Sequence, residues 1–318
     1  MPEFYDRYET RAPRSRDAAL LRDLRGILSV AKSRAAGLRH QLKNIELDSL
    51  KGRADLAQIP VVRATDLTGR EKEMPPFGGA CATRPGALLH LLMAQGAVFL
   101  PEGHAKDWWN AARALYAAGI RKGDVVLNCF PYHFVAEGHM LDSGLRALGC
   151  PVIPAGDADL AATLTAIAHY APTAYCGPSD YLVNLAEKAT QSGQTISSLK
   201  RAFIGTSPVS PETKMALAPH DIALYSAYAP AHLGVVAYET EARDAFVVSE
   251  GLIVEIVRPG SNDPLPAGQF GEIVVTRLNA DYPLLRFGTG DISAIVGGPS
   301  PCGRTNMRIA RVQAAAAA

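Results

Sequence analysis

The sequence predicts an α/β protein with a mostly parallel sheet covered by helices, followed by a small antiparallel β part. Two observations give this prediction. Between residues 107 and 225, short apolar runs alternate with segments of helical length, a pattern typical of parallel sheets. After about residue 245 the helical segments stop, and short apolar runs are joined by turns such as 260–271 (GSNDPLPAGQFG).

The first ninety residues predict one long helix among irregular segments. Residues 16–36 place apolar side chains at helical spacing, so we expect an amphipathic helix there. Residues 54–59 predict a short helical or loop piece, and 66–69 predict a turn. The run PPFGG at 75–79 marks a change of element.

The α/β part is expected in residues 91–244. Its predicted helices are 107–119, 140–148, 157–170, 179–189 and 210–217, and its predicted strands are 124–130, 151–154, 173–176, 201–204 and 222–225. Ser179 and Ser210 are expected to cap two of the helices, and Pro211 suits a first helical position.

The antiparallel part is expected in residues 245–312. Its predicted strands are 245–248, 252–258, 272–277 and 291–296. Together with residues 1–90 and 91–244, this part is expected to form one large domain, residues 1–312. The alanine-rich run 313–318 is expected not to be native.

Composition narrows the class of partner. The chain has 318 residues, of which 48% are hydrophobic, enough for a sizeable core. Lys and Arg number 32 against 31 Asp and Glu, so the near-neutral charge offers no basic surface for nucleic acid. The five cysteines are scattered without a C-x-x-C pair, which predicts neither a disulfide framework nor a zinc cluster.

The sequence also gives no targeting signal. The N-terminus is too polar for a secretory signal, and the most apolar window, 86–100, is shorter than the roughly 20 residues of a membrane-spanning helix. We therefore expect a soluble, cytoplasmic protein.

Residues 281–291 (DYPLLRFGTGD) predict a ligand-binding loop. An apolar run leads to Arg286, and two glycines around Thr289 allow positive φ and close backbone approach before Asp291. A carboxylate ending such a loop can accept hydrogen bonds from both hydroxyls of a ribose. The alternative is a strand followed by a glycine turn with a surface aspartate.

In open α/β sheets, ligands bind beyond the carboxyl ends of the strands. The segments that follow predicted strands are therefore candidates for the site. They are 131–138 (PYHFVAEG), 177–178 (GP), 205–208 (GTSP) and 226–234 (SAYAPAHLG).

The order of six motifs, PYHFVAEG, GTSP, YAPAHLG, DPLPAGQFGEIVVT, YPLLRFGTGD and PCGRTNMRI, resembles the phenylacetate–coenzyme A ligase family of acyl-adenylate-forming enzymes. The resemblance covers residues 5–311 and implies the large N-terminal domain of such an enzyme. It implies that an aryl carboxylate attacks ATP to give an acyl-adenylate, and that coenzyme A then displaces AMP to form a thioester. Relatives are often dimers, so a homodimer is expected as a possible assembly.

The resemblance also implies roles for individual residues. Asp291 would bind the ribose, Tyr228 would stack on adenine beside Ala229, and Arg304 would lie near the nucleotide. The strand-end loop would contribute Gly205, Thr206 and Ser207 to the cofactor site. The residues implied at the aryl pocket are Tyr132, His133, Phe134, Ala136 and Gly138, and those implied in catalysis are His232 and Arg286.

Several of these residues have a structural alternative. The alternative for Tyr132 and Phe134 is that they are aromatic side chains of the core. The alternative for His133 is that it is a polar residue whose hydrogen bonds are made within the protein. The alternative for Arg286 is a structural ion pair, and the alternative for Arg304 is a side chain that caps a turn.

The sequence departs from the family in four places. Residues 91–103 (LLMAQGAVFLPEG) replace its Ser/Thr/Gly-rich phosphate loop, and Gly288 replaces a second arginine. His232 stands where an acid would hold Mg²⁺; imidazole is a poor Mg²⁺ ligand, so no metal ligand is assigned, and a protonated His232 would contact phosphate instead. The sequence ends just after Arg311, so we expect the C-terminal lid domain to be absent.

Three hypotheses follow. The first is an ATP-dependent ligase that uses coenzyme A. The second is a non-adenylating relative that binds a nucleotide, an acyl-adenylate or a thioester without ATP chemistry. The third is an unrelated α/β protein whose glycine motif is only structural.

Overall fold

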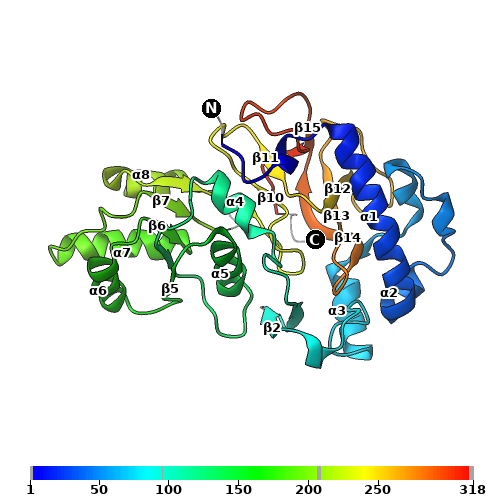
Figure 1. The fold of residues 1–318 in the computed structure, drawn as a ribbon, viewed down its shortest axis with the longest axis horizontal. Coiled ribbons are helices and arrows are strands. Elements are labelled where there is room, and N and C mark those ends of the chain that lie inside the picture. The colour runs from blue at the N-terminus through cyan, green and yellow to red at the C-terminus, as the bar shows by residue number, and fades with distance from the viewer. Residues whose placement is uncertain (1–2, 95, 206–208, 315–318) are drawn as a thin grey trace. The chain divides into compact units, whose positions relative to one another are not determined.

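The computed structural model describes residues 3–94, 96–205 and 209–314. It divides into two compact units. The first unit comprises residues 1–5 and 105–246, and the second comprises residues 6–104 and 247–318. Each unit has its own sheet and helices, labelled in Figure 1.

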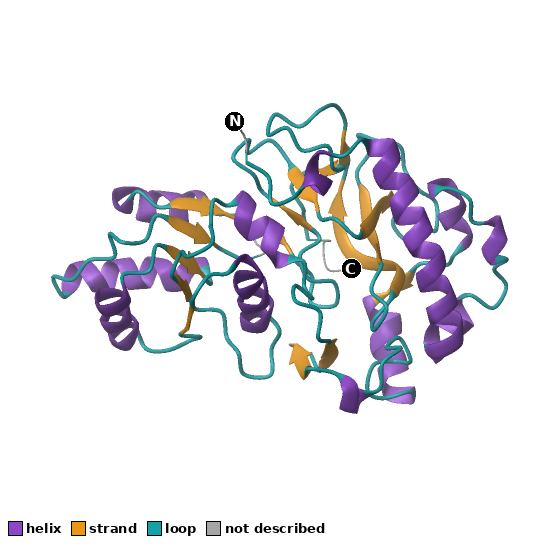
Figure 2. Ribbon diagram, in the orientation of Figure 1, coloured by secondary structure: helices purple, strands orange, loops and turns teal. Residues whose placement is uncertain are grey.

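The first unit is built on a five-stranded sheet whose neighbouring strands all run parallel, in the order β5-β4-β6-β7-β8. The strands are β4 (Val126–Asn128), β5 (Val152–Pro154), β6 (Ala174–Cys176), β7 (Arg201–Phe203) and β8 (Ala223–Tyr225). The helices are α4 (Ala111–Ala117), α5 (Glu137–Leu148), α6 (Leu160–Tyr170), α7 (Ser179–Gln191) and α8 (Pro211–Leu217), with η5 (Ala218–His220) after the last. In Figure 2, α6 and α7 lie on one side of this sheet and α5 on the other. The predicted α/β fold class is confirmed.

Alternating side chains of this sheet form the core beneath α6, α7 and α8. The buried members from strands are Leu127, Tyr175 and Ala202, and those from helices include Leu164, Leu182, Leu185 and Leu217. On α5, a Cβ at Gly144 would lie 2.6 Å from the Cβ of Ala111, so glycine is what allows α5 to lie close against α4.

The helix starts in this unit follow local side-chain chemistry. Ser210 accepts a hydrogen bond from the N–H of Thr213 and caps α8, as predicted. The prediction that Ser179 caps α7 is wrong, because Pro178 is the N-cap and Ser179 is already helical. α4 begins later than predicted because the carboxylate of Asp107 accepts from the first free N–H groups of the helix.

The second unit contains a four-stranded sheet in the order β1-β14-β13-β12. Strands β12 (Leu252–Val257), β13 (Gly271–Arg277) and β14 (Leu284–Ser293) are antiparallel neighbours, and β1 (Val62–Arg63) pairs in parallel with β14. The helices are α1 (Pro13–Arg34), α2 (Ala36–Gln41) and α3 (Ala64–Glu73), with the 3-10 turns η1 (Arg7–Thr10), η2 (Leu47–Ser49), η3 (Arg53–Gln58) and η4 (Pro85–Ala87). The long helix predicted near the N-terminus is α1.

Helix α1 covers one face of this sheet. Its apolar stripe of Leu20, Leu24, Ile27 and Leu28 is buried in one cluster with Ile253 of β12 and Leu285 of β14. The helical N-terminal part and the antiparallel C-terminal part, expected as successive regions, therefore share one core. Residues 66–69, predicted as a turn, lie inside α3.

Short strand pairs complete the two units. The first unit holds β9 (Ala227–Tyr228) paired with β10 (Ala237–Tyr238). The second holds the hairpin of β2 (His90–Ala94) and β3 (Val98–Glu102), and the pair of β15 (Ile295–Val296) and β16 (Arg308–Ile309). Strand β11 (Phe246–Val248) stands at the boundary of the units along the chain. Among the described residues, none of the helices combines the length and apolar character needed to cross a membrane.

Candidate functional site

A cavity of about 280 Å³ opens in the first unit at the carboxyl ends of its parallel strands. Phe130 follows β4, Phe203 and Gly205 stand at the end of β7, and Ala227 follows β8. The rest of the wall is Ala136, Glu137, Met140 and Leu141 at the start of α5, together with Ala229, Pro230, Ala231 and Val235. This edge is where the sequence placed ligand binding, and the wall is almost entirely apolar.

The segment between β4 and α5 is held against the cavity by close backbone packing. Asn128 donates from Nδ2 to the carbonyl of Gly138 and to the hydroxyl of Tyr132. A Cβ at Gly138 would come within 2.6 Å of the carbonyl oxygen of Pro131, so glycine is required there.

The five residues implied at the aryl pocket separate into two groups. Ala136 lines the cavity, whereas Gly138 and Tyr132 are not among its lining residues and lie against each other. Burial raises the pKa of the Tyr132 hydroxyl, so the hydroxyl stays protonated. His133 and Phe134 are exposed, and Phe134 adopts a left-handed backbone (φ 61°) with 71% of its surface free. The structure does not place these last two at the cavity.

The segment after β8 is fixed by a buried acid. Glu239 accepts hydrogen bonds from the N–H and hydroxyl of Ser226, and from the guanidinium of Arg243. The N–H of Val235 donates to the carbonyl of Trp109, and a Cβ at Gly234 (φ 72°) would lie 2.5 Å from that oxygen. Only glycine allows this approach, which explains the glycine that ends YAPAHLG.

The predicted cofactor residues of the first unit lie along this segment and the neighbouring strand end. Gly205 and Ala229 line the cavity, and Tyr228 is 5% exposed in β9, paired with Ala237. Thr206 and Ser207 lie outside the described residues. His232, implied in catalysis, is 5% exposed and has an interaction partner within the protein.

The predicted glycine loop in the second unit is a bulged strand. Residues 287–291 belong to β14, so the expectation of a loop is wrong. Gly288 pairs with Val274 and Ile292 with Glu272, so residues 289–291 face the single position 273. The hydroxyl of Thr289 donates to the carbonyl of Ile273 and accepts from the N–H of Asp291. A bulge of this kind re-aims a side chain, and here it sets the direction of the partly exposed Asp291.

Arg286 has a structural setting. Its side chain is fully buried, Nε lies 3.0 Å from Glu255, and its other nitrogens donate to the carbonyls of Ile59 and Asn262. Each of its three nitrogens donates to a protein group, which favours the ion-pair alternative over the predicted catalytic contact. Arg304 is likewise buried, with Nε 2.6 Å from Glu9.

The structure thus gathers the predicted residues into two sets. Ala136, Gly205 and Ala229 line one cavity of the first unit, and Tyr132 and Gly138 lie in the same unit, whereas Asp291, Arg286 and Arg304 belong to the second unit. A shared crevice for Tyr228 and Asp291 stays a prediction.

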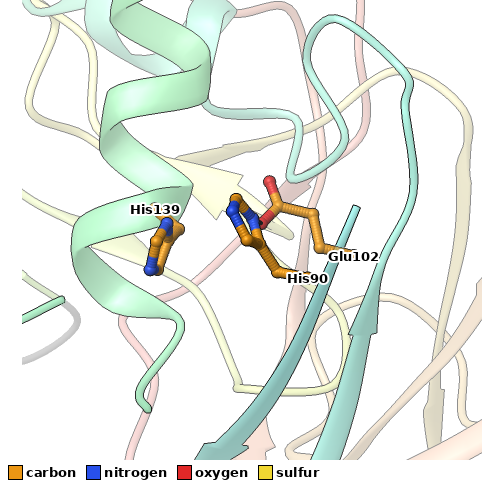
Figure 3. Close-up of side chains that lie close together, drawn as sticks. All are labelled: His90, Glu102 and His139. Carbon is orange, nitrogen blue, oxygen red and sulfur yellow. Dashed lines mark hydrogen bonds and ion pairs between the residues drawn. The ribbon is translucent and has the colours of Figure 1, made fainter. Parts of the chain in front are cut away.

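The segment expected in place of the phosphate loop is the β2–β3 hairpin. Its strands are joined by only the three residues 95–97, with Gly96 and Ala97 at positive φ. The open end of the hairpin carries a polar pair, since Nδ1 of His90 lies 2.8 Å from the buried carboxylate of Glu102 (Figure 3).

Only Ala136, Gly205 and Ala229 of the lining residues were named from the sequence as site residues. Among those not named is Glu137, which stands in the PYHFVAEG segment between two residues that were selected, and which is the single charged side chain among the described residues of the cavity wall. Its acidic character in that segment was the available signal.

Known proteins of similar sequence are ligases that use coenzyme A. A phenylacetate–coenzyme A ligase of Thermus thermophilus is 28% identical over 93% of this chain and 70% of its own length. A second, from Pseudomonas putida, is 27% identical over 79% of this chain and 60% of its own length. The chain therefore spans about three fifths to seven tenths of these relatives, and the predicted resemblance is confirmed.

The solved structures agree on the fold. A 2-hydroxyisobutyryl-CoA ligase in an open conformation, in complex with 2-HIB-AMP and CoA, matches 99% of this chain and 74% of its own, with a TM-score of 0.89 at 24% identity. A long-chain-fatty-acid-CoA ligase of Archaeoglobus fulgidus matches 72% of this chain and 51% of its own, with a TM-score of 0.55 at 16% identity. Residues 103–279, more than half of the sequence, match the AMP-binding enzyme family, and the chain belongs to that family.

Proposed function

We propose that this chain forms the large part of an ATP-dependent ligase that joins a small aryl or acyl carboxylate to coenzyme A through an acyl-adenylate. The observation that carries the proposal is the cavity at the carboxyl ends of β4 and β7, which lies wholly within the stretch that matches the AMP-binding family. An apolar cavity at this sheet edge suits the tail of the acid.

In the proposed reaction the carboxylate attacks the α-phosphorus of ATP and pyrophosphate leaves. The thiol of coenzyme A then attacks the acyl carbon and AMP leaves. Such a reaction needs the carboxylate and phosphorus held in line, and it needs water kept from the mixed anhydride. The apolar wall formed by Phe130, Met140 and Phe203 supports the second requirement.

The nucleotide roles remain those implied by the resemblance. We assign adenine to Tyr228 and the ribose hydroxyls to Asp291, whose bulged strand leaves its carboxylate partly exposed. We assign no catalytic role to Arg286, because its guanidinium is already occupied. No magnesium ligand is assigned either, since His232 replaces the expected acid and imidazole is a poor partner for Mg²⁺.

The test is acid-dependent exchange of labelled pyrophosphate into ATP, measured with this chain and with the complete gene product. Exchange that requires an aromatic or short aliphatic acid, together with magnesium and ATP, supports adenylation. Formation of a thioester on adding coenzyme A supports the second step. AMP binding by calorimetry without exchange for any acid of a broad panel contradicts the proposal.

A second candidate function is favoured by the hairpin. Residues 91–103, which form most of this hairpin, differ in sequence from the Ser/Thr/Gly-rich loop that the resemblance implies for the triphosphate, so a relative that binds AMP, an acyl-adenylate or a thioester without ATP chemistry fits this feature. This candidate predicts that AMP and ATP bind with equal affinity, since the β- and γ-phosphates gain no contacts. Clearly tighter binding of ATP contradicts it.

The cytoplasmic location and the homodimer expected from the sequence remain proposals. Light scattering of the purified protein tests whether it is a homodimer.

A further inference from the structure

The cavity of the first unit has one charged group in an apolar wall. Glu137 is the first residue of α5, and the other lining residues are Phe, Ala, Met, Leu, Gly, Pro and Val. No cation is among them. Any charge on Glu137 is therefore uncompensated by the described cavity wall.

The carboxylate of Glu137 has no hydrogen-bond partner among the described residues. Its Oε2 atom is shielded from solvent and unpaired. Glu137 forms part of the cavity wall, so a molecule bound in the cavity can approach its carboxylate. Buried polar groups in proteins are almost always hydrogen-bonded, so a carboxylate shielded on one side has a strong demand for a donor on the other.

The position in the helix does not account for this arrangement. Acids are common in first turns because the N-terminal end of a helix attracts negative charge. Glu212, in the first turn of α8, shows the ordinary case: it is exposed, and hydrogen bonds with its own backbone N–H and with Ser210 lower its pKa. Glu137 has the same kind of helix position without such hydrogen bonds, and it faces a cavity.

We propose that Glu137 is a specificity-determining residue that selects acids whose tail carries a hydrogen-bond donor, such as an amino or hydroxyl group. The apolar side chains of Phe130, Met140 and Phe203 would pack against the hydrocarbon part of the tail, and the carboxylate of Glu137 would accept from the donor. The inference rests on the proposed function, because it takes the cavity as the place of the acyl tail. An acid without a donor leaves the carboxylate unpaired, and sites of this kind discriminate strongly against such analogues.

The experiment uses three acids of similar shape: 4-aminophenylacetate, 4-methylphenylacetate and phenylacetate. Binding of each is measured by calorimetry in the presence of AMP, and pyrophosphate exchange is measured with ATP. The wild-type protein is expected to bind 4-aminophenylacetate at least about tenfold more tightly than 4-methylphenylacetate. This factor corresponds to one good hydrogen bond to a charged group.

Glu137→Ala is expected to remove this preference by weakening the amino compound while leaving the methyl compound unchanged or tighter. Glu137→Gln, which keeps an acceptor oxygen, is expected to retain part of the preference. The matched control is Glu212→Gln, which changes an acid in another first turn of the same unit and should leave the ratio unchanged. Circular dichroism melts check that each variant is folded. If Glu137→Ala does not fold, the ratio of the affinities of Glu137→Gln for the amino and methyl compounds decides.

The outcomes separate this inference from the proposed function. Equal binding of the three acids, or a preference that survives both Glu137 variants, overturns the role of Glu137 even if exchange occurs. Absence of exchange with every acid contradicts the ligase, and a binding preference abolished by Glu137→Ala would still support the role of Glu137.

Discussion

Asp291 illustrates, at the scale of single residues, how backbone geometry gives a carboxylate its direction. Thr289 fixes the bulge by one hydrogen bond to β13 and one to the N–H of Asp291, and Gly290 (φ 81°) supplies the conformation that other residues avoid. The sequence indicated these three residue types correctly. It could not indicate that they interrupt a strand instead of ending one, because the pairing partner lies on β13.

Replacing Asp291 with Ala is expected to weaken AMP binding about 10- to 100-fold, since hydrogen bonds to a charged group contribute roughly 1.5–3 kcal/mol. The measurement is the AMP dissociation constant by calorimetry. Asp263→Ala, which changes an exposed acid of the same unit, is the control and should bind AMP as the wild type does. An unchanged constant in a folded Asp291→Ala protein would remove this residue from the nucleotide site.

At the scale of elements, the pair of Arg286 and Glu255 joins strands β14 and β12. The guanidinium also donates to the carbonyl of Ile59, just after η3, so one side chain ties two strands to the N-terminal segment. Burial raises the pKa of Glu255, and the charge of Arg286 opposes that shift. Removal of one partner would leave the other buried without its counter-charge.

Arg286→Met is therefore expected to lower the free energy of unfolding by about 3–5 kcal/mol, as for other broken buried pairs. Urea denaturation measures the change, and Arg258→Met, at an exposed position following β12, is the control. Adding Glu255→Gln to Arg286→Met should recover part of the loss. A single variant as stable as the wild type but unable to catalyse exchange would restore the predicted catalytic role.

The sequence predicted helices and strands well where they depend only on neighbouring residues. The alternation of apolar runs and helical segments gave each strand from β4 to β8, and Ser210 marked the start of α8 correctly. The hairpin of β2 and β3 was missed because its strands lie in one apolar window with only Gly96 as a turn signal. Glu137 was missed because its place in a cavity wall depends on three separate strand ends that the chain brings together.

At the scale of the whole molecule, the order of elements along the chain differs from their grouping in space. The N-terminal helix α1 shares a core with β12 and β14, although more than two hundred residues separate them in sequence. Periodicity reports which face of a helix is buried and carries no information about its partner. The two-unit division was therefore beyond the sequence, whereas the order of motifs was enough to identify the family.

The free energy of unfolding should depend on pH through the titration of Glu71, a residue of α3 with 6% of its surface exposed. Burial raises the pKa of this carboxyl from its ordinary 4.5 to about 7. Between these two values the folded protein keeps the proton and the unfolded chain has released it, so the contribution of Glu71 to stability falls as pH rises from about 4.5 to about 7, and is constant above. Glu71→Gln should abolish this fall and make the protein more stable than the wild type at pH 8 by up to about 3 kcal/mol, with little difference at low pH.

Urea denaturation of the two proteins across this pH range measures the difference directly. Glu73→Gln is the matched control, because it changes an exposed acid on the same helix and should follow the wild-type curve. Other buried acids, such as Asp107, whose pKa burial also raises, contribute equally to both proteins and cancel in the comparison. A difference between wild type and Glu71→Gln that does not vary with pH would show that folding does not shift the pKa of Glu71, and a variant that is less stable at pH 8 would show that its charge is stabilised by a partner in the folded state.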